Sequence, residues 1–160
     1  LSPEMKSTGE AIGYDNTLTR ALYKALKASG NRVENYGTVF ATIANEDKEA
    51  ALPLIRRFYN LGFNIEATAG TATFLKEHGI RTRAMGKISE GATDILEALK
   101  QGHITYVLNT QSHNNGTNDG IMIRRAAVEN NVTIFTSLDT VSVLLDVLEE
   151  ITVGVSTIDA

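Results

Sequence analysis

Cysteine is absent from this 160-residue chain, and histidine is scarce. Without cysteine the protein has no disulfides, no thiolate metal sites and no cysteine nucleophile. The three histidines, His78, His103 and His113, lie far apart in sequence and lack the short spacing of a zinc motif. We therefore expect no metal and no cofactor in this domain.

Concentrated positive charge and long apolar runs are lacking as well. The formal net charge is −4, and no block of lysine and arginine stands out, so we expect neither a nucleic acid nor a membrane as partner. No apolar run approaches the length that spans a bilayer, and no signal peptide is visible. A cytoplasmic protein is the expectation.

What is present is the composition of an ordinary globular protein, with 42% hydrophobic and 21% charged residues. The length suits one domain with a sizeable core. The chain opens on Leu1 rather than Met and continues as if from the middle of a polypeptide. We therefore expect a fragment of a longer protein.

Apolar periodicity predicts helices that alternate with strands. Helices are predicted over residues 15–29, 48–61, 70–78, 93–101, 119–130 and 138–150, and strands over residues 38–44, 63–68, 81–85, 104–109 and 132–136. Residues 151–160 alternate like an edge strand or form a loose tail. This order is typical of βαβ units, and it predicts an α/β fold with a parallel sheet between two layers of helices.

Residues 67–71, Ala-Thr-Ala-Gly-Thr, join a predicted strand directly to a predicted helix. Thr68 and Thr71 supply hydroxyl groups, Gly70 supplies a permissive backbone, and the helix N-terminus supplies N–H groups at the positive end of its dipole. Such a junction is an anion site. The plainer interpretation is that Thr68 caps an ordinary helix and Gly70 relaxes the turn.

Other polar residues favour the anion interpretation, because they follow the remaining predicted strands. The carboxyl ends of parallel strands meet at one edge of the sheet, where ligands of such folds bind. These further residues are Thr42, Lys48, Lys87, Asn109 and Gln111. Lysines and hydroxyl groups suit a phosphate monoester, and the two amides suit a ribose or a base edge.

Several stretches resemble the methylglyoxal-synthase-like domain family: Glu46-Asp47-Lys48, the run from Gly62 to Ala72, and Lys87-Ile88-Ser89-Glu90-Gly91. More narrowly, the stretch from Ser2 to Glu10, together with Asn109-Thr110 and Ile123-Arg124-Arg125-Ala126, resembles the C-terminal end of the carbamoyl-phosphate synthetase large subunit. The likeness runs from residue 2 to about residue 148. The string Pro-Glu-Met-Lys-Ser-Thr-Gly-Glu is its most specific part.

This resemblance implies a Rossmann-like three-layer sandwich around a parallel five-stranded sheet. It implies a non-catalytic allosteric domain that binds UMP, or alternatively IMP. The parent ligase makes carbamoyl phosphate from glutamine, bicarbonate and ATP for pyrimidine and arginine synthesis, and uses Mg or Mn and K. Implied partners are the rest of the large subunit, the small glutaminase subunit and further copies of the chain. Residues 1–30 would close the second ATP-grasp unit, residues 31–150 would form the regulatory domain, and residues 151–160 a tail.

The resemblance also implies which residues hold the effector. They are Thr42, Lys48, Thr68, Gly70, Thr71, Lys87, Asn109, Gln111 and Asp119. Gln111 stands where the family has threonine. Ile134 and Phe135 stand where members activated by ornithine carry Tyr-Asp, and an apolar pair cannot hold a buried ammonium. We therefore expect a pyrimidine-type regulator, and we expect Lys48 and Thr71 to be exposed in the empty site.

Two alternatives remain open. Methylglyoxal synthase shares the fold and eliminates phosphate from a triose phosphate, but that enzyme needs a His-Asp pair where this chain has Ala44-Asn45. It also needs a Gly-Gly-Asp loop, which residues 89–94 do not reproduce, so Asp94 and Asp119 are the candidate bases. The second alternative is an oligomerisation module that uses Ile134 and Phe135, although such residues usually belong to a core.

Overall fold

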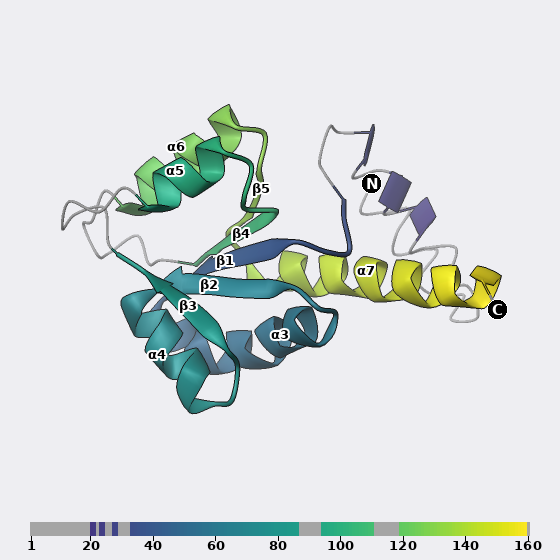
Figure 1. Cartoon of the computed structure of the whole chain (residues 1–160), viewed down its shortest axis with the longest axis horizontal. Coiled ribbons are helices and arrows are strands. Elements are labelled where there is room, and N and C mark those ends of the chain that lie inside the picture. Colours follow the sequence, from purple (N-terminus) through teal and green to yellow (C-terminus); the bar gives the residue numbers. More distant parts are fainter. Residues whose placement is uncertain are drawn as a thin grey trace.

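Strands and helices alternate along the chain (Figure 1). The computed structural model describes residues 20, 21, 23, 24, 27, 28, 33–86, 94–110 and 119–159, with the side chains of residue 119 and of residues 154–159 left out. The strands are β1 (Thr38–Thr42), β2 (Asn64–Thr68), β3 (Thr82–Met85), β4 (Tyr106–Asn109) and β5 (Thr133–Phe135). The helices are the 3-10 turn η2 (Asn45–Asp47), α3 (Lys48–Asn60), α4 (Ala69–Glu77), α5 (Asp94–Lys100), α6 (Asp119–Glu129) and α7 (Leu138–Asp159).

The five strands form one parallel sheet in the order β3-β2-β1-β4-β5. From the central strand β1 the chain moves outward through β2 to β3, and then returns to the other side of β1 for β4 and β5. The order therefore reverses between β1 and β4, which is where open α/β sheets place their ligands. The predicted five-stranded parallel sheet is confirmed.

Helices cover both faces of the sheet and make the three layers (Figure 1). On one face, alternate strand residues such as Val39 and Ala41 pack with buried residues of α3, α4 and α7. On the other face, Phe40 and Val107 pack with buried residues of α5 and α6. The side chains of a strand point alternately to its two faces, so each buried strand serves both cores.

Tyr106 lies at the centre of the larger core, on β4. Its ring centroid is 6.1 Å from that of Phe58, 5.9 Å from that of Phe63 and 6.1 Å from that of Phe135. Its hydroxyl donates to the carbonyl of Glu34 at 2.6 Å and accepts from the amide of Glu34 at 2.7 Å. A buried phenol needs such partners, and here they fasten the segment before β1 to the core.

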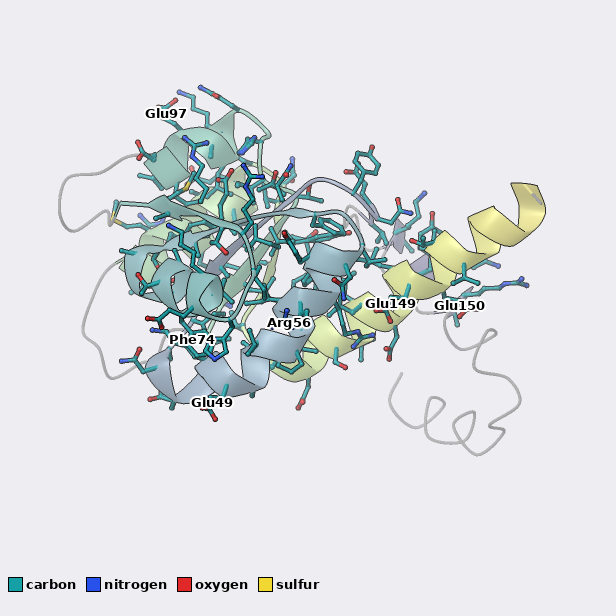
Figure 2. All side chains as sticks on the ribbon, turned by 60° about the horizontal axis from the view of Figure 1, so that its bottom comes forward. Glu49, Arg56, Phe74, Glu97, Glu149 and Glu150 are labelled. Atoms are coloured by element: carbon teal, nitrogen blue, oxygen red, sulfur yellow. The ribbon has the colours of Figure 1, made fainter. Side chains whose placement is uncertain are left out.

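Helix α7 corrects the prediction for the end of the chain. It continues to Asp159, past the predicted end at residue 150, so the edge-strand interpretation is wrong for residues 151–159. α7 lies beside α3 (Figures 1 and 2), and Arg57 of α3 donates to Glu149 at 2.6 and 3.0 Å and to Asp146 at 2.9 Å. The hydrogen bond to Glu149 raises the pKa of Arg57 further above its already high value.

The apolar pair Ile134 and Phe135 belongs to the core. Phe135 is buried in the larger cluster, and Ile134 packs against the smaller one. The pair therefore forms no exposed strip for association. Among the described helices, none is both long and apolar enough to cross a membrane.

All five strands are shorter than predicted, by one or two residues each. The first ends at Thr42 rather than at residue 44, because the amides of Ile43 and Ala44 donate to threonine hydroxyl groups instead of a neighbouring strand. The fourth begins at Tyr106 rather than at residue 104. The predicted helix 15–29 lies largely outside the described residues, and those described within it are helical.

Candidate anion site at the carboxyl edge of the sheet

Three of the predicted site residues end adjacent strands at one edge of the sheet. Thr42 of β1 pairs in register with Asn109 of β4, and Thr68 ends β2 on the other side of β1. The expected meeting of strand ends is confirmed. Thr42 and Asn109 are buried, and the amide group of Asn109 donates to the carbonyl of Gly120 at 3.2 Å. In this structure Asn109 thus positions the start of α6.

Threonine hydroxyl groups hold the loop that follows β1. Thr71 accepts a hydrogen bond from the amide of Ile43 at 3.1 Å, and Thr110 accepts one from the amide of Ala44 at 3.2 Å. The amide of Thr110 in turn donates to the carbonyl of Thr42 at 3.1 Å. Segments that follow β1, β2 and β4 are therefore joined where the strand order reverses.

The structure corrects the expectation for Thr71. Thr71 is 2% exposed rather than open to solvent, because the first turn of α4 packs it against the loop after β1. Thr71 therefore supports the backbone of the site. The sequence around it showed a strand-to-helix junction but not this partner 28 residues away.

Thr68 occupies the N-cap position of α4, with φ −64° and ψ 158°, but its side chain makes no capping hydrogen bond. Its hydroxyl instead lies 3.5 Å from that of Thr71. The interpretation of Thr68 as a helix cap is thus right about its position at the start of α4. It is wrong about the hydrogen bond, because the Thr68 side chain accepts none from the backbone of the first turn. The N-terminus of α4 lacks the side-chain acceptor that a capped helix has.

Lys48 brings a cation to the same helix end. A Cβ atom on Gly70, the second residue of α4, would lie 3.5 Å from the Lys48 ammonium. Nζ donates to the amide oxygen of Asn45 at 2.6 Å, and among the described residues Lys48 has no ion pair. A cation beside the positive end of a helix dipole is unfavourable unless an anion joins them. The arrangement is therefore suited to an oxyanion.

The remaining predicted residues are not placed. Lys87 and Gln111 lie outside the described residues, and Asp119 begins α6 without a described side chain. Their part in the site stays a prediction. Asp94, the other candidate base, is exposed at the start of α5.

Two residues that were not predicted as site members complete the local structure. Asn45 orients Lys48, and Thr110 fixes the loop after β1. Two sequence features could have pointed to these residues: Asn45 is an amide three positions before Lys48, and Thr110 is a hydroxyl residue directly after β4. Within the described part of the chain, no three side chains of His, Asp or Glu gather in a way that could hold a metal ion.

Comparison with known proteins places this arrangement in a family. The chain is similar to methylglyoxal synthase from Elizabethkingia anophelis NUHP1, with a TM-score of 0.60 and 14% sequence identity, over 71% of this chain and 79% of that one. At this identity the likeness shows the fold. A family model described as the MGS-like domain matches residues 50–136, which is more than half of the chain. The chain therefore belongs to the MGS-like domain family.

Proposed function

We propose that this chain is a regulatory domain that binds a nucleoside monophosphate by its phosphate at the N-terminus of α4. The observation that carries the proposal is the position of the Lys48 ammonium beside Gly70, with no ion pair to a described residue. A dianionic phosphate would satisfy the cation and the helix dipole together. Hydrogen bonds to charged groups are worth about 1.5–3 kcal/mol each, which is enough for specific binding.

The proposed contacts divide by exposure. Lys48, the half-buried Thr68 and the backbone at Gly70 face the phosphate, while the buried Thr42 and Thr71 hold the strand ends beneath it. Lys87, Asn109, Gln111 and Asp119 are further proposed contacts to the phosphate, ribose or base. The phosphate is common to all nucleoside monophosphates. The choice between UMP and IMP would therefore depend on those of these four residues that contact the ribose or the base.

We further propose that the parent protein is a carbamoyl-phosphate synthetase and that UMP is the effector. Support comes from the strings Ser2 to Glu10 and Ile123-Arg124-Arg125-Ala126, which resemble the end of its large subunit. An effector changes catalysis only if it binds one conformation of the whole enzyme better than another. This domain would thus supply the binding step, and the catalytic units would supply the response.

A lyase is the second candidate, because the fold is also that of a methylglyoxal synthase. Elimination of phosphate from a triose phosphate needs a base in contact with the carbon acid. At the positions where the enzyme needs His-Asp, this chain has Ala44, whose amide is bound to Thr110, and Asn45, whose amide oxygen is bound to Lys48. Neither side chain can accept a proton at neutral pH.

Calorimetric titration of the chain with UMP, IMP and inorganic phosphate tests the proposal. We expect saturable binding of UMP, tighter than that of phosphate. Incubation with dihydroxyacetone phosphate, followed by colorimetric detection of methylglyoxal, tests the lyase and should show no product. Formation of methylglyoxal with multiple turnovers would favour the lyase, and absence of binding to all three titrants would contradict the phosphate site itself.

A further inference from the structure

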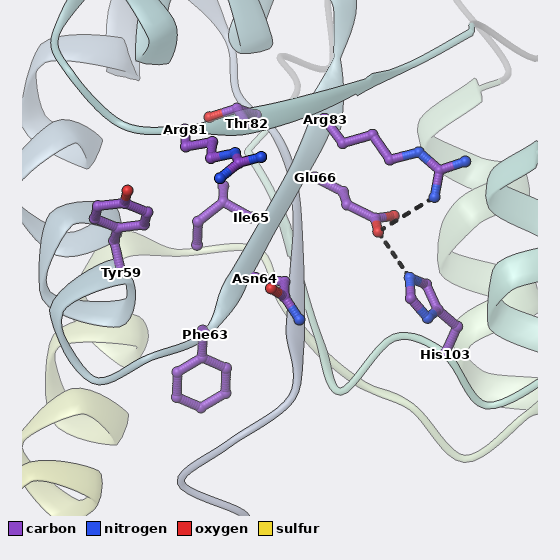
Figure 3. Close-up of a pocket in the computed structure, with 9 residues that line it drawn as sticks. All are labelled: Tyr59, Phe63, Asn64, Ile65, Glu66, Arg81, Thr82, Arg83 and His103. Atoms are coloured by element: carbon purple, nitrogen blue, oxygen red, sulfur yellow. Dashed lines mark hydrogen bonds and ion pairs between the residues drawn. The ribbon is translucent and has the colours of Figure 1, made fainter.

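A hollow lies at the edge of the sheet opposite the proposed phosphate site, where β2 and β3 begin (Figure 3). β3 starts at Thr82, in register with Ile65, so Asn64 has a strand partner only on the β1 side. The missing pairing leaves a cavity of about 330 Å³. Its polar and aromatic lining includes Tyr59, Asn64, Glu66, Arg81, Arg83 and His103. We call it the amino-edge pocket.

A buried carboxylate, that of Glu66, belongs to this pocket; its Oε1 has no hydrogen-bond partner among the described residues, whereas its Oε2 has two polar neighbours. Glu66 is 4% exposed, and its Oε2 lies 2.7 Å from His103 Nε2 and 3.9 Å from a guanidinium nitrogen of Arg83. Figure 3 shows both partners converging on this carboxylate. A buried carboxylate needs such compensation. Arg83 already supplies one positive charge near this carboxylate, so Arg81 brings a second positive charge to the pocket.

Arg81 is exposed, and its guanidinium makes no hydrogen bond or ion pair with a described residue. In Figure 3 it lies between the ring of Tyr59 and the Glu66 cluster. Two arginines against one carboxylate give the pocket an excess of positive charge in a chain whose net charge is −4. A guanidinium presents parallel N–H groups that fit a carboxylate or a phosphate.

We propose that the amino-edge pocket is a second binding site, separate from the phosphate site, for a small organic oxyanion. Arg81 binds the carboxylate or phosphate monoester group, Asn64 of the same pocket lining is a further donor, and the ring of Tyr59 contacts the apolar body of the ligand. The volume suits a ligand of small-molecule size. The two sites lie at opposite ends of the strands, so occupation of one leaves the other open.

The test is a titration followed by NMR of the isotopically labelled chain, with benzoate, phenyl phosphate and inorganic phosphate as probes. We expect saturable shifts of the Asn64, Thr82 and Arg83 amides with benzoate or with phenyl phosphate. Benzoate alone would identify a carboxylate site, and phenyl phosphate alone a phosphate monoester site. Shifts confined to Gly70 and Thr71, or no saturable shift, would overturn the proposal without touching the phosphate site.

Variants make the assignment specific. Arg81→Gln should weaken binding about tenfold or more through loss of a charge-assisted contact, whereas Arg124→Gln removes the same charge from an exposed position on α6 and should change nothing. Glu66→Gln removes the negative charge within the pocket and should tighten binding. Equal affinity in Arg81→Gln and Arg124→Gln would overturn the proposal. If Arg81→Gln fails to fold, Glu66→Gln decides: weaker binding of the probe by Glu66→Gln than by the parent chain would overturn the proposal.

Discussion

The ammonium of Lys48, the first residue of α3, lies beside Gly70 in the first turn of α4, and a Cβ added to Gly70 would stand 3.5 Å from Nζ. This contact joins two parts of the chain that come from different βα units. It places a full positive charge beside the positive end of a nine-residue helix. Repulsion between the Lys48 charge and the positive end of the helix dipole costs free energy in the empty protein, and a bound phosphate would offset that cost.

Gly70→Ala is expected to separate stability from binding. The position is helical, and the new methyl group would meet Lys48 only at an ordinary contact distance. Alanine stabilises a helix interior by about 0.5–1 kcal/mol relative to glycine, so the free energy of unfolding in urea should rise slightly. The methyl group also fills the space beside the ammonium, so affinity for UMP should fall. Unchanged affinity would place the phosphate elsewhere.

Thr71→Val is expected to destabilise the protein. The substitution keeps the shape of the side chain but removes the acceptor for the buried amide of Ile43. Loss of a partner for a buried donor costs about 1–3 kcal/mol, measurable by urea unfolding. Thr71→Ser keeps the hydroxyl and is the matched control, which should retain most of the stability. Equal stability of the Val and Ser variants would contradict this role for the hydroxyl.

Gly37→Ala is expected to be among the most damaging single substitutions. Gly37 has φ +121°, and a Cβ there would collide with the hydroxyl of Thr105. Gly62→Ala is the control, since Gly62 has φ +99° with open space around its Cβ. Backbone strain alone costs about 1–3 kcal/mol. The Gly37 variant should therefore lose more stability to urea than the Gly62 variant, and equal losses would show that the collision is relieved.

Much of the fold could be predicted from the sequence, because the periodicities of its strands and helices are strong. The meeting of Thr42, Thr68 and Asn109 followed from one rule, that parallel strands end at the same edge. The end of α7 could not be predicted in the same way. Residues 151–159 alternate in polarity, yet they continue a helix already formed from Leu138 onward. Propagation of an existing helix costs less than a new start.

The site was predicted less completely, because its support depends on contacts between distant residues. The burial of Thr71 depends on Ile43, and the pairing of Glu66 with His103 joins residues that are 37 positions apart. Neither pair has a local sequence pattern. The proximity of Lys48 to Gly70 likewise follows from the packing of α3 beside α4 rather than from a motif.

The proposed phosphate site is tested most directly by calorimetric titration of Lys48→Gln with UMP. The matched control is Lys76→Gln. It removes the same charge from an exposed position in the last turn of α4, at the end of that helix away from the proposed site. We expect Lys48→Gln to lose about 1.5–3 kcal/mol of binding free energy, as for a hydrogen bond to a charged group. Lys76→Gln should bind UMP as the parent chain does. Equal affinity of the two variants would contradict a phosphate site at the N-terminus of α4.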